Sequence, residues 1–140
     1  MKSLDFITGL PKQKSLSFGF YSSYIIDHSS FPKYVIDELG LTNKSTLTLE
    51  TVIGGTVNPH VDSGPRQSHI LWMLTQSPMT VVTTTGTTVL NYGDSMVVES
   101  KSTHSASVQD SKDATFLGVD YGKNYTETQE IYQKIINKIG

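Results

Sequence analysis

The stretch VIGGTVNPHVDSGPRQSHILWMLT, residues 52–75, contains the segment that decides the fold. Within it, residues 67–75 are apolar at both alternating positions of an extended chain. One set is Ile70, Trp72 and Leu74, and the other is Leu71 and Met73. A strand that is apolar on both faces is typical of a central strand covered on both sides. The segment therefore predicts a buried central strand.

Further short strands are predicted on either side of this segment. Residues 45–53 alternate polar and apolar side chains with the period of a strand, and Gly86 between two Thr-rich runs predicts a tight hairpin. The other expected strands cover residues 15–26, 56–61, 80–85, 87–90, 95–99, 106–108 and 114–121. Short strands separated by turn residues are typical of a sandwich, a barrel or a jelly roll.

Two helices are expected beside the strands. A short helix is predicted over residues 31–39, where Ser30 can cap the start and Gly40 ends it. The end of the chain, residues 126–139, predicts an amphipathic helix because isoleucines recur there every fourth residue. The fold class is therefore mainly β, and a chain of 140 residues is expected to form one domain, 1–140.

Composition narrows the classes of partner and cofactor. Charged residues make up 17% of the chain, the net charge is −2 and the only arginine is Arg66. Nucleic-acid binding needs a basic patch, so nucleic acid is not expected as a main partner. The absence of cysteine excludes disulfides, Fe–S clusters and thiolate zinc sites.

Hydropathy gives an expectation about location. The first residues, MKSLDFITGLPKQ, contain no apolar run of the length of a signal peptide. No stretch of 18 apolar residues is present, so no membrane-spanning helix is expected. We therefore expect a cytoplasmic protein.

The triplet His60-Val61-Asp62 is the first motif that can carry chemistry. Residues i and i+2 of an extended chain point to the same side, so the imidazole and the carboxylate are expected to project together. His104 follows 44 residues later, after about four predicted strands. In a double-stranded β-helix, four strands return the chain to the neighbourhood of the first pair. Two histidines and one carboxylate suit non-haem Fe(II), which needs open positions.

The segments around these residues resemble a known family. VIGGTVNPHVDSGPRQSHILWML is similar to the iron-binding segment of the 2-oxoglutarate and Fe(II)-dependent oxygenases, in particular small prolyl-hydroxylase-like members. NYGDSMVVESKSTHSASV resembles the later segment of that family, which carries the second histidine. The resemblance implies a double-stranded β-helix (jelly roll, cupin-like) with the helices packed on one sheet. It also implies Fe(II) held by His60, Asp62 and His104.

The resemblance further implies a hydroxylase. Its cosubstrates would be O₂ and 2-oxoglutarate, and its product a hydroxylated peptidyl side chain or small molecule. The family usually holds the distal carboxylate of 2-oxoglutarate with an arginine before the last strand, but this chain has Lys112 near that place. Lysine supplies the charge without the bidentate geometry of arginine. Lys112 is the first candidate for this carboxylate and Arg66 the second.

A substrate pocket is expected near the start of the central strand, with His69, Trp72 and Met73 as candidates. For Trp72 a place in the hydrophobic core is the competing interpretation. The missing arginine favours a second hypothesis, in which the chain is a non-catalytic or 2-oxoglutarate-independent jelly-roll module that binds a metal or assembles with a partner. A cupin-like isomerase or sugar-binding protein is a third.

Overall fold

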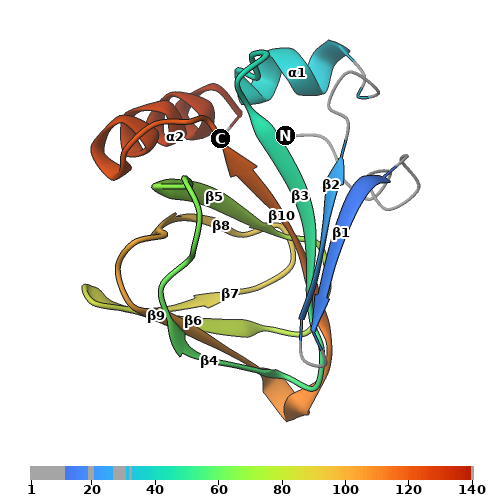
Figure 1. Cartoon of the computed structure of the whole chain (residues 1–140). Coiled ribbons are helices and arrows are strands. Elements are labelled where there is room, and N and C mark those ends of the chain that lie inside the picture. Colours follow the sequence, from blue (N-terminus) through green and yellow to red (C-terminus); the bar gives the residue numbers. More distant parts are fainter. Residues whose placement is uncertain (1–11, 19–20, 27–30, 32, 140) are drawn as a thin grey trace.

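Two antiparallel sheets lie against each other, and two helices cover the outer face of the larger sheet (Figure 1). The computed structural model describes residues 12–18, 21–26, 31 and 33–139. No helix in this described part of the chain is long and apolar enough to cross a membrane.

The larger sheet has six strands in the order β1-β2-β3-β10-β5-β8. Their bounds are Lys12–Phe18, Tyr21–Ile26, Thr46–Val52, Ala114–Asp120, Ser68–Met73 and Ser95–Glu99 in that order. The four-stranded sheet has the order β4-β9-β6-β7. Its strands are Thr56–His60, His104–Val108, Met79–Thr83 and Gly86–Leu90. From β3 to β10 the chain passes repeatedly between the sheets, which is the predicted jelly-roll topology.

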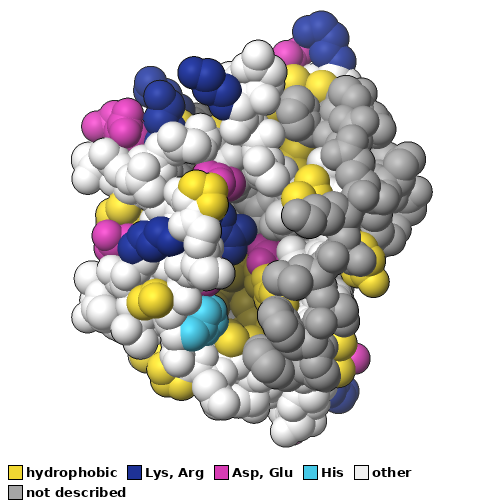
Figure 2. Space-filling view, viewed as in Figure 1, with side chains coloured by type: hydrophobic (Ala, Val, Ile, Leu, Met, Phe, Trp, Pro, Cys, Tyr) yellow, Lys and Arg dark blue, Asp and Glu magenta, His cyan; other side chains and the backbone are white. Residues whose placement is uncertain are grey.

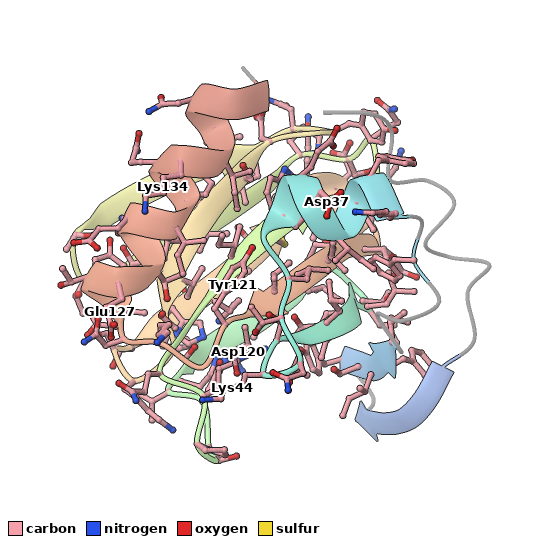
Figure 3. The ribbon with its side chains drawn as sticks, turned by 90° about the horizontal axis from the view of Figure 1, so that it is seen from above. Asp37, Lys44, Asp120, Tyr121, Glu127 and Lys134 are labelled. Atoms are coloured by element: carbon pink, nitrogen blue, oxygen red, sulfur yellow. The ribbon has the colours of Figure 1, made fainter. Side chains whose placement is uncertain are left out.

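The two helices, α1 (Lys33–Leu39) and α2 (Tyr125–Ile139), lie on the same side of the larger sheet (Figure 3). α2 packs on β5 and β8, and α1 contacts α2. Tyr121, directly after β10, donates a hydrogen bond to the carbonyl oxygen of Leu39 at 2.5 Å. This bond joins the end of α1 to the end of the sheet. The prediction that the helices pack on one sheet is confirmed.

Buried apolar side chains form two separate clusters on the two faces of the larger sheet. The helix-side core consists of Ile26, Phe31, Val35, Leu39, Leu41, Leu47, Leu49, Ile70, Trp72, Val97, Leu117, Val119, Tyr121 and Ile135. The inter-sheet core consists of Val52, Leu71, Met73, Met79, Val81, Leu90, Val98, Val108, Ala114 and Phe116. Strand β5 contributes alternate residues to both and is buried along its whole length, as its sequence predicts.

One strand prediction needs correction. Residues 15–26 were expected as a single extended stretch, but they belong to two antiparallel strands, with Phe18 opposite Tyr21. Residues 19 and 20, between the two strands, lie outside the described residues. Strand composition on both sides of a glycine does not tell a continuous strand from a hairpin, because both have the same alternation.

Candidate metal centre

Strands β4 and β9 bring His60 and His104 together. These strands pair antiparallel, and His60 lies directly opposite His104 in the register. The register is irregular between Val57 and His60, next to Pro59, which cannot donate a ladder hydrogen bond. Val57 and His60 both line the cavity, as do Asn58 and Pro59 between them.

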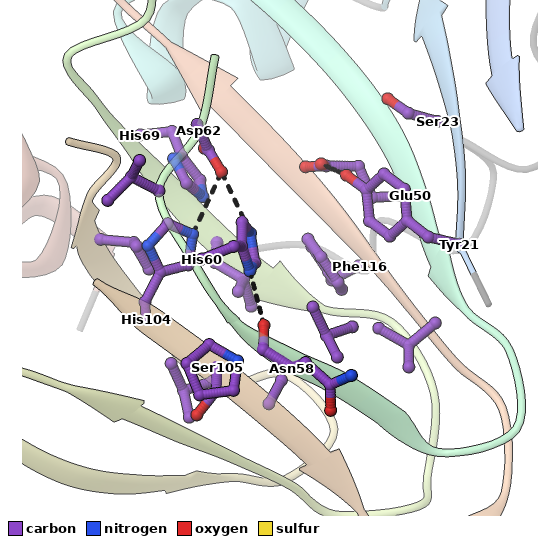
Figure 4. Close-up of a pocket in the computed structure, with 18 of the residues that line it drawn as sticks. Tyr21, Ser23, Glu50, Asn58, His60, Asp62, His69, His104, Ser105 and Phe116 are labelled. Carbon is purple, nitrogen blue, oxygen red and sulfur yellow. Dashed lines mark hydrogen bonds and ion pairs between the residues drawn. The ribbon is translucent and has the colours of Figure 1, made fainter. Parts of the chain in front are cut away.

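His60, Asp62 and His104 form one compact group of donor atoms (Figure 4). The Oδ1 atom of Asp62 lies 3.3 Å from Nε2 of His60 and 3.2 Å from Nε2 of His104. The centroids of the two imidazole rings are 4.4 Å apart. The structure thus brings together the three residues that the sequence suggested as metal ligands.

Hydrogen bonds on the far side of each ring determine which nitrogen faces the group. Nδ1 of His60 lies 2.8 Å from the carbonyl oxygen of Asn58, and Nδ1 of His104 lies 2.8 Å from that of Ser102. A carbonyl only accepts, so Nδ1 donates in both rings and Nε2 of a neutral ring keeps its lone pair. Two such lone pairs and a carboxylate oxygen directed at one point form a typical metal-ligand set.

The second oxygen of Asp62 is held by Arg66. Nη2 of Arg66 donates to Oδ2 of Asp62 at 2.9 Å, which leaves Oδ1 directed toward the histidines. Burial by itself raises the pKa of Asp62, but the hydrogen bonds from His104 and Arg66 outweigh it and hold this pKa well below its usual range. Burial lowers the pKa of His104, yet the bond to Asp62 outweighs this effect and raises it. Without a metal, the ionised carboxylate of Asp62 thus favours the protonated form of His104.

The loop that carries Asp62 is fixed to the turn after β8. The backbone N–H of Asp62 donates to the carbonyl oxygen of Ser100 at 2.8 Å. Nζ of Lys101 donates to the carbonyl oxygens of Asp62 at 2.9 Å and Gly64 at 2.5 Å. These bonds hold the carboxylate beside the histidines although Asp62 lies beyond the end of β4.

The three donors lie at the edge of a cavity of about 520 Å³ between the two sheets. Figure 2 shows a hollow in the surface with a histidine at its rim and hydrophobic side chains inside it. The apolar part of its lining is made of Val52, Val57, Pro59, Val61, Leu71, Met79, Val81, Val98, Ala106 and Phe116. Arg66 is the only lysine or arginine among the described residues that line it. A ligand at the triad would therefore meet a mainly apolar wall and one cation.

Glu50 of β3 is a polar lining residue that sequence reasoning missed. The residue is 2% exposed. It accepts hydrogen bonds from the hydroxyl groups of Tyr21 and Thr48, and Arg66 lies 3.8 Å away. Burial raises the pKa of Glu50 to about 7, although Arg66 opposes the shift. The alternation of β3 suggests that its polar face is open to solvent, and only the second sheet shows that this face is covered.

His69 lines the cavity from β5, as the sequence suggested. It is 4% exposed, and its Nδ1 lies 2.8 Å from Oγ of Ser100. Burial lowers the pKa of His69 well below its usual value, and Arg66 adds to the effect. His69 is therefore neutral at pH 7, and it is not part of the donor group.

Three other candidates lie away from the cavity lining. Trp72 lies on the opposite face of β5, in the helix-side core, with its ring centroid 6.5 Å from that of Tyr132 on α2. Met73 is buried in the inter-sheet core, beyond the residues that line the cavity. Lys112 is exposed in the turn before β10. The alternation of β5 explains Trp72, because residues 69 and 71 face the cavity and residue 72 must face away.

Comparison with known proteins identifies the architecture. No protein-family model matches the chain, and no curated protein matches it in sequence. Among solved structures, KdgF from a Halomonas species aligns with a TM-score of 0.55 and 14% identity, over 82% of this chain and 91% of that one. This chain has a cupin-like jelly-roll fold.

Two further cupin-like alignments cover a smaller part of the other protein. AerE from Microcystis aeruginosa aligns with a TM-score of 0.58 and 11% identity, over 81% of this chain and 47% of that one. Oxalate decarboxylase from Bacillus subtilis aligns with a TM-score of 0.54 and 19% identity, over 81% and 28%. At such identities the likeness shows the fold alone. The cupin-like fold does not by itself set a reaction, so function must be argued from the site.

Proposed function

We propose that this chain is a mononuclear metalloenzyme that holds Fe(II) with His60, Asp62 and His104 and hydroxylates a small substrate. The observation that carries the proposal is the convergence of two imidazole Nε2 atoms and one carboxylate oxygen at the edge of a cavity. Three ligands on one side of a metal leave the positions that O₂ and a cosubstrate need. Bound Fe(II) would supply the activation of O₂, with 2-oxoglutarate as the reductant that is converted to succinate and CO₂.

The protein's own part in this reaction is to position the ligands and exclude water. The carbonyl oxygens of Asn58 and Ser102 orient the two imidazoles, and Arg66 orients Asp62. The apolar wall of the cavity keeps bulk water away from the reacting positions. No described side chain other than the three donors is needed to hold the metal.

Arg66 is the best candidate for the carboxylate of 2-oxoglutarate. It is the only lysine or arginine among the described lining residues, whereas Lys112 lies outside the lining. Its guanidinium already binds Asp62, but a guanidinium has five N–H donors and can serve a second carboxylate. Arg66, in the loop after the His-x-Asp triplet, would therefore take the place of the arginine that the resembled family usually has before its last strand.

An anaerobic titration of the metal-free protein with Fe(II) and then 2-oxoglutarate tests the proposal. We expect one Fe(II) per chain and a weak visible charge-transfer band after 2-oxoglutarate is added. The band should be absent in His60→Ala, Asp62→Ala and His104→Ala, and present in a Glu130→Gln control on the exposed side of α2. Iron binding without a band would remove 2-oxoglutarate from the proposal. If the chain binds no iron, the proposal that it is an Fe(II) enzyme is wrong.

A second candidate function is a cupin-like metal enzyme or metal-binding module without 2-oxoglutarate. It is favoured by the charges in the cavity. Arg66, the only lysine or arginine among the described lining residues, already donates to Asp62 and lies 3.8 Å from Glu50. One of the solved structures of oxalate decarboxylase is described as having Mn(II) centres. Tight Mn(II) binding together with no response to 2-oxoglutarate would favour this second candidate.

A further inference from the structure

Glu50 is a buried acid that the proposed reaction does not use. Three strands of the larger sheet build its surroundings: β3 provides Glu50 and Thr48, β2 provides Tyr21, and β10 provides Gly118. Figure 4 shows Glu50 and Tyr21 across the cavity from the metal triad. The carboxyl group therefore belongs to the wall that a ligand of the metal would face.

The space for this carboxyl group depends on Gly118. A Cβ atom at position 118 would lie 2.4 Å from Oε2 of Glu50 and 2.6 Å from Oγ1 of Thr48. Any other residue there would force the Glu50 and Thr48 side chains to move. Gly118 has ordinary strand backbone, so its role is to leave space and not to allow an unusual φ.

Stability alone does not explain a carboxyl group at this position. Removing a carboxyl group from water costs several kcal/mol, and apolar replacements of buried charged groups are often neutral or stabilising. The neighbouring inward positions, Val52 on β3 and Phe116 on β10, are apolar. A strongly perturbed acid within a cavity is a common mark of a functional residue.

Glu50 has hydrogen-bonding capacity left for a ligand. An ionised carboxyl group has about four acceptor positions, and a protonated one still accepts at its carbonyl oxygen. Among the described residues, Tyr21 and Thr48 donate one hydrogen bond each to Glu50. Arg66, at 3.8 Å, is beyond hydrogen-bonding distance. A donor group entering from the cavity can therefore bind Glu50 without displacing either hydroxyl.

We propose that Glu50 is a substrate-binding residue that accepts a hydrogen bond from a hydroxyl group of the substrate. The inference rests on the proposed function in one respect, since it places the reacting part of the same substrate at the metal triad. The substrate is then a small molecule with an apolar body and a hydroxyl group on the side away from the metal.

The charges around Glu50 favour a neutral donor. Arg66 lies 3.8 Å away and repels an ammonium group that would bind the same carboxyl. An anionic group in direct contact with Glu50 would be repelled by the negative charge of the Glu50 carboxylate itself. A hydroxyl group avoids both penalties and still pairs with the carboxyl oxygen.

Matched ligand pairs test the proposal by NMR on the ¹⁵N-labelled full chain, with Zn(II) as a diamagnetic metal. The probes are glycolate, 3-hydroxypropionate, 4-hydroxybutyrate and 5-hydroxypentanoate, each paired with the unsubstituted acid of equal chain length. The amide of Gly118 reports on binding next to Glu50. At one chain length, we expect the hydroxy acid to bind about ten- to a hundredfold more tightly than its partner.

Three variants separate an acceptor role from a structural one. The preference should fall below about twofold in Glu50→Leu and return in part in Glu50→Gln, because the amide oxygen still accepts. It should persist in Thr48→Val, which removes a hydrogen bond to Glu50 but leaves the carboxyl group. No preference at any chain length, or an equal preference in Glu50→Leu, would overturn the proposal.

The same samples distinguish the proposal of a metal centre from the proposal that Glu50 binds substrate. Zinc uptake is read from the side-chain signals of His60 and His104, and failure to bind zinc counts against the metal centre. The ligand pairs are therefore measured on the metal-free protein as well. A Glu50-dependent hydroxyl preference there supports the binding residue even if the metal centre fails, and its absence in both forms overturns it.

Discussion

The two faces of the six-stranded sheet differ in what they bury. The helix-side face packs leucine, isoleucine, valine and aromatic side chains beneath α1 and α2. The other face packs apolar side chains at one end only, and at the other end it carries Glu50 and His69 beside a cavity. Neighbouring residues of one strand illustrate the contrast, since Leu49 lies in the helix-side core and Glu50 lines the cavity.

This contrast indicates that the helix-side face of the sheet mainly stabilises the fold, whereas the other face carries the candidate site. Close packing leaves no room for a ligand, so a site needs a region where the side chains do not fill the space. In this chain the unfilled region lies between the sheets, where the rim strands β4 and β9 supply the histidines. Substitutions on the two faces should therefore have separable effects.

Loss of a metal ligand should give the largest effect on the cavity side. Asp62→Ala removes one of three donors and leaves Arg66 without its carboxylate partner. We expect Fe(II) or Zn(II) affinity to fall more than about a hundredfold, since even residues that only orient ligands contribute 10–100-fold. Competition with a chromophoric chelator measures it, and Glu130→Gln is the control.

On the helix side, Leu117→Ala should lower stability and leave metal binding unchanged. Leu117 is fully buried in the helix-side core, so the cost should be about 2–5 kcal/mol in the free energy of unfolding. The matched change Leu71→Ala, at the cavity wall, should cost only about 2 kcal/mol, the lower end of that range, because the space beside it is already unfilled. Urea unfolding measures both. Equal costs would contradict the division between the faces.

Glu50→Gln should change how stability depends on pH. The pKa of Glu50 is raised from 4.5 to about 7 in the folded chain, so its favourable contribution is present below pH 4.5 and is lost as the pH rises through 7. We expect the wild type to lose about 2–3 kcal/mol more than Glu50→Gln between pH 5 and pH 8. Urea unfolding at several pH values measures the difference.

Arg66→Gln should weaken metal binding without removing a ligand. Arg66 donates to Oδ2 of Asp62, and residues that orient a ligand typically contribute 10–100-fold to affinity, so we expect a loss of about tenfold. Chelator competition measures it. An unchanged affinity would mean that the backbone bonds of the loop hold Asp62 without help.

Lys112→Gln, with the same change of charge, should have the smallest effect. Lys112 is exposed and outside the cavity lining, so we expect less than about a twofold change in the affinity for Fe(II) or 2-oxoglutarate. Titration of the charge-transfer band measures it. A loss as large as that of Arg66→Gln would return Lys112 to the candidate cosubstrate site.

The sequence predicted the strands and the grouping of His60, Asp62 and His104 better than the lining of the cavity. Alternation places His60 and Asp62 on one side of an extended chain, and the number of strands before His104 predicts its return to them. It could not show the register irregularity between Val57 and His60, next to Pro59. Nor could it tell that the polar face of β3 is covered, because a Thr/Glu alternation is equally typical of a solvent-facing strand.

The sequence by itself determined the strand and helix segments and the residue types available as ligands, since these follow from local periodicity and from side-chain chemistry. Only the tertiary structure decided that Arg66 binds Asp62, that Lys112 lies outside the cavity and that Gly118 leaves space for Glu50. Each of these depends on which strands become neighbours and on which face each side chain lies. Such contacts join residues far apart in the chain, and no local pattern encodes them.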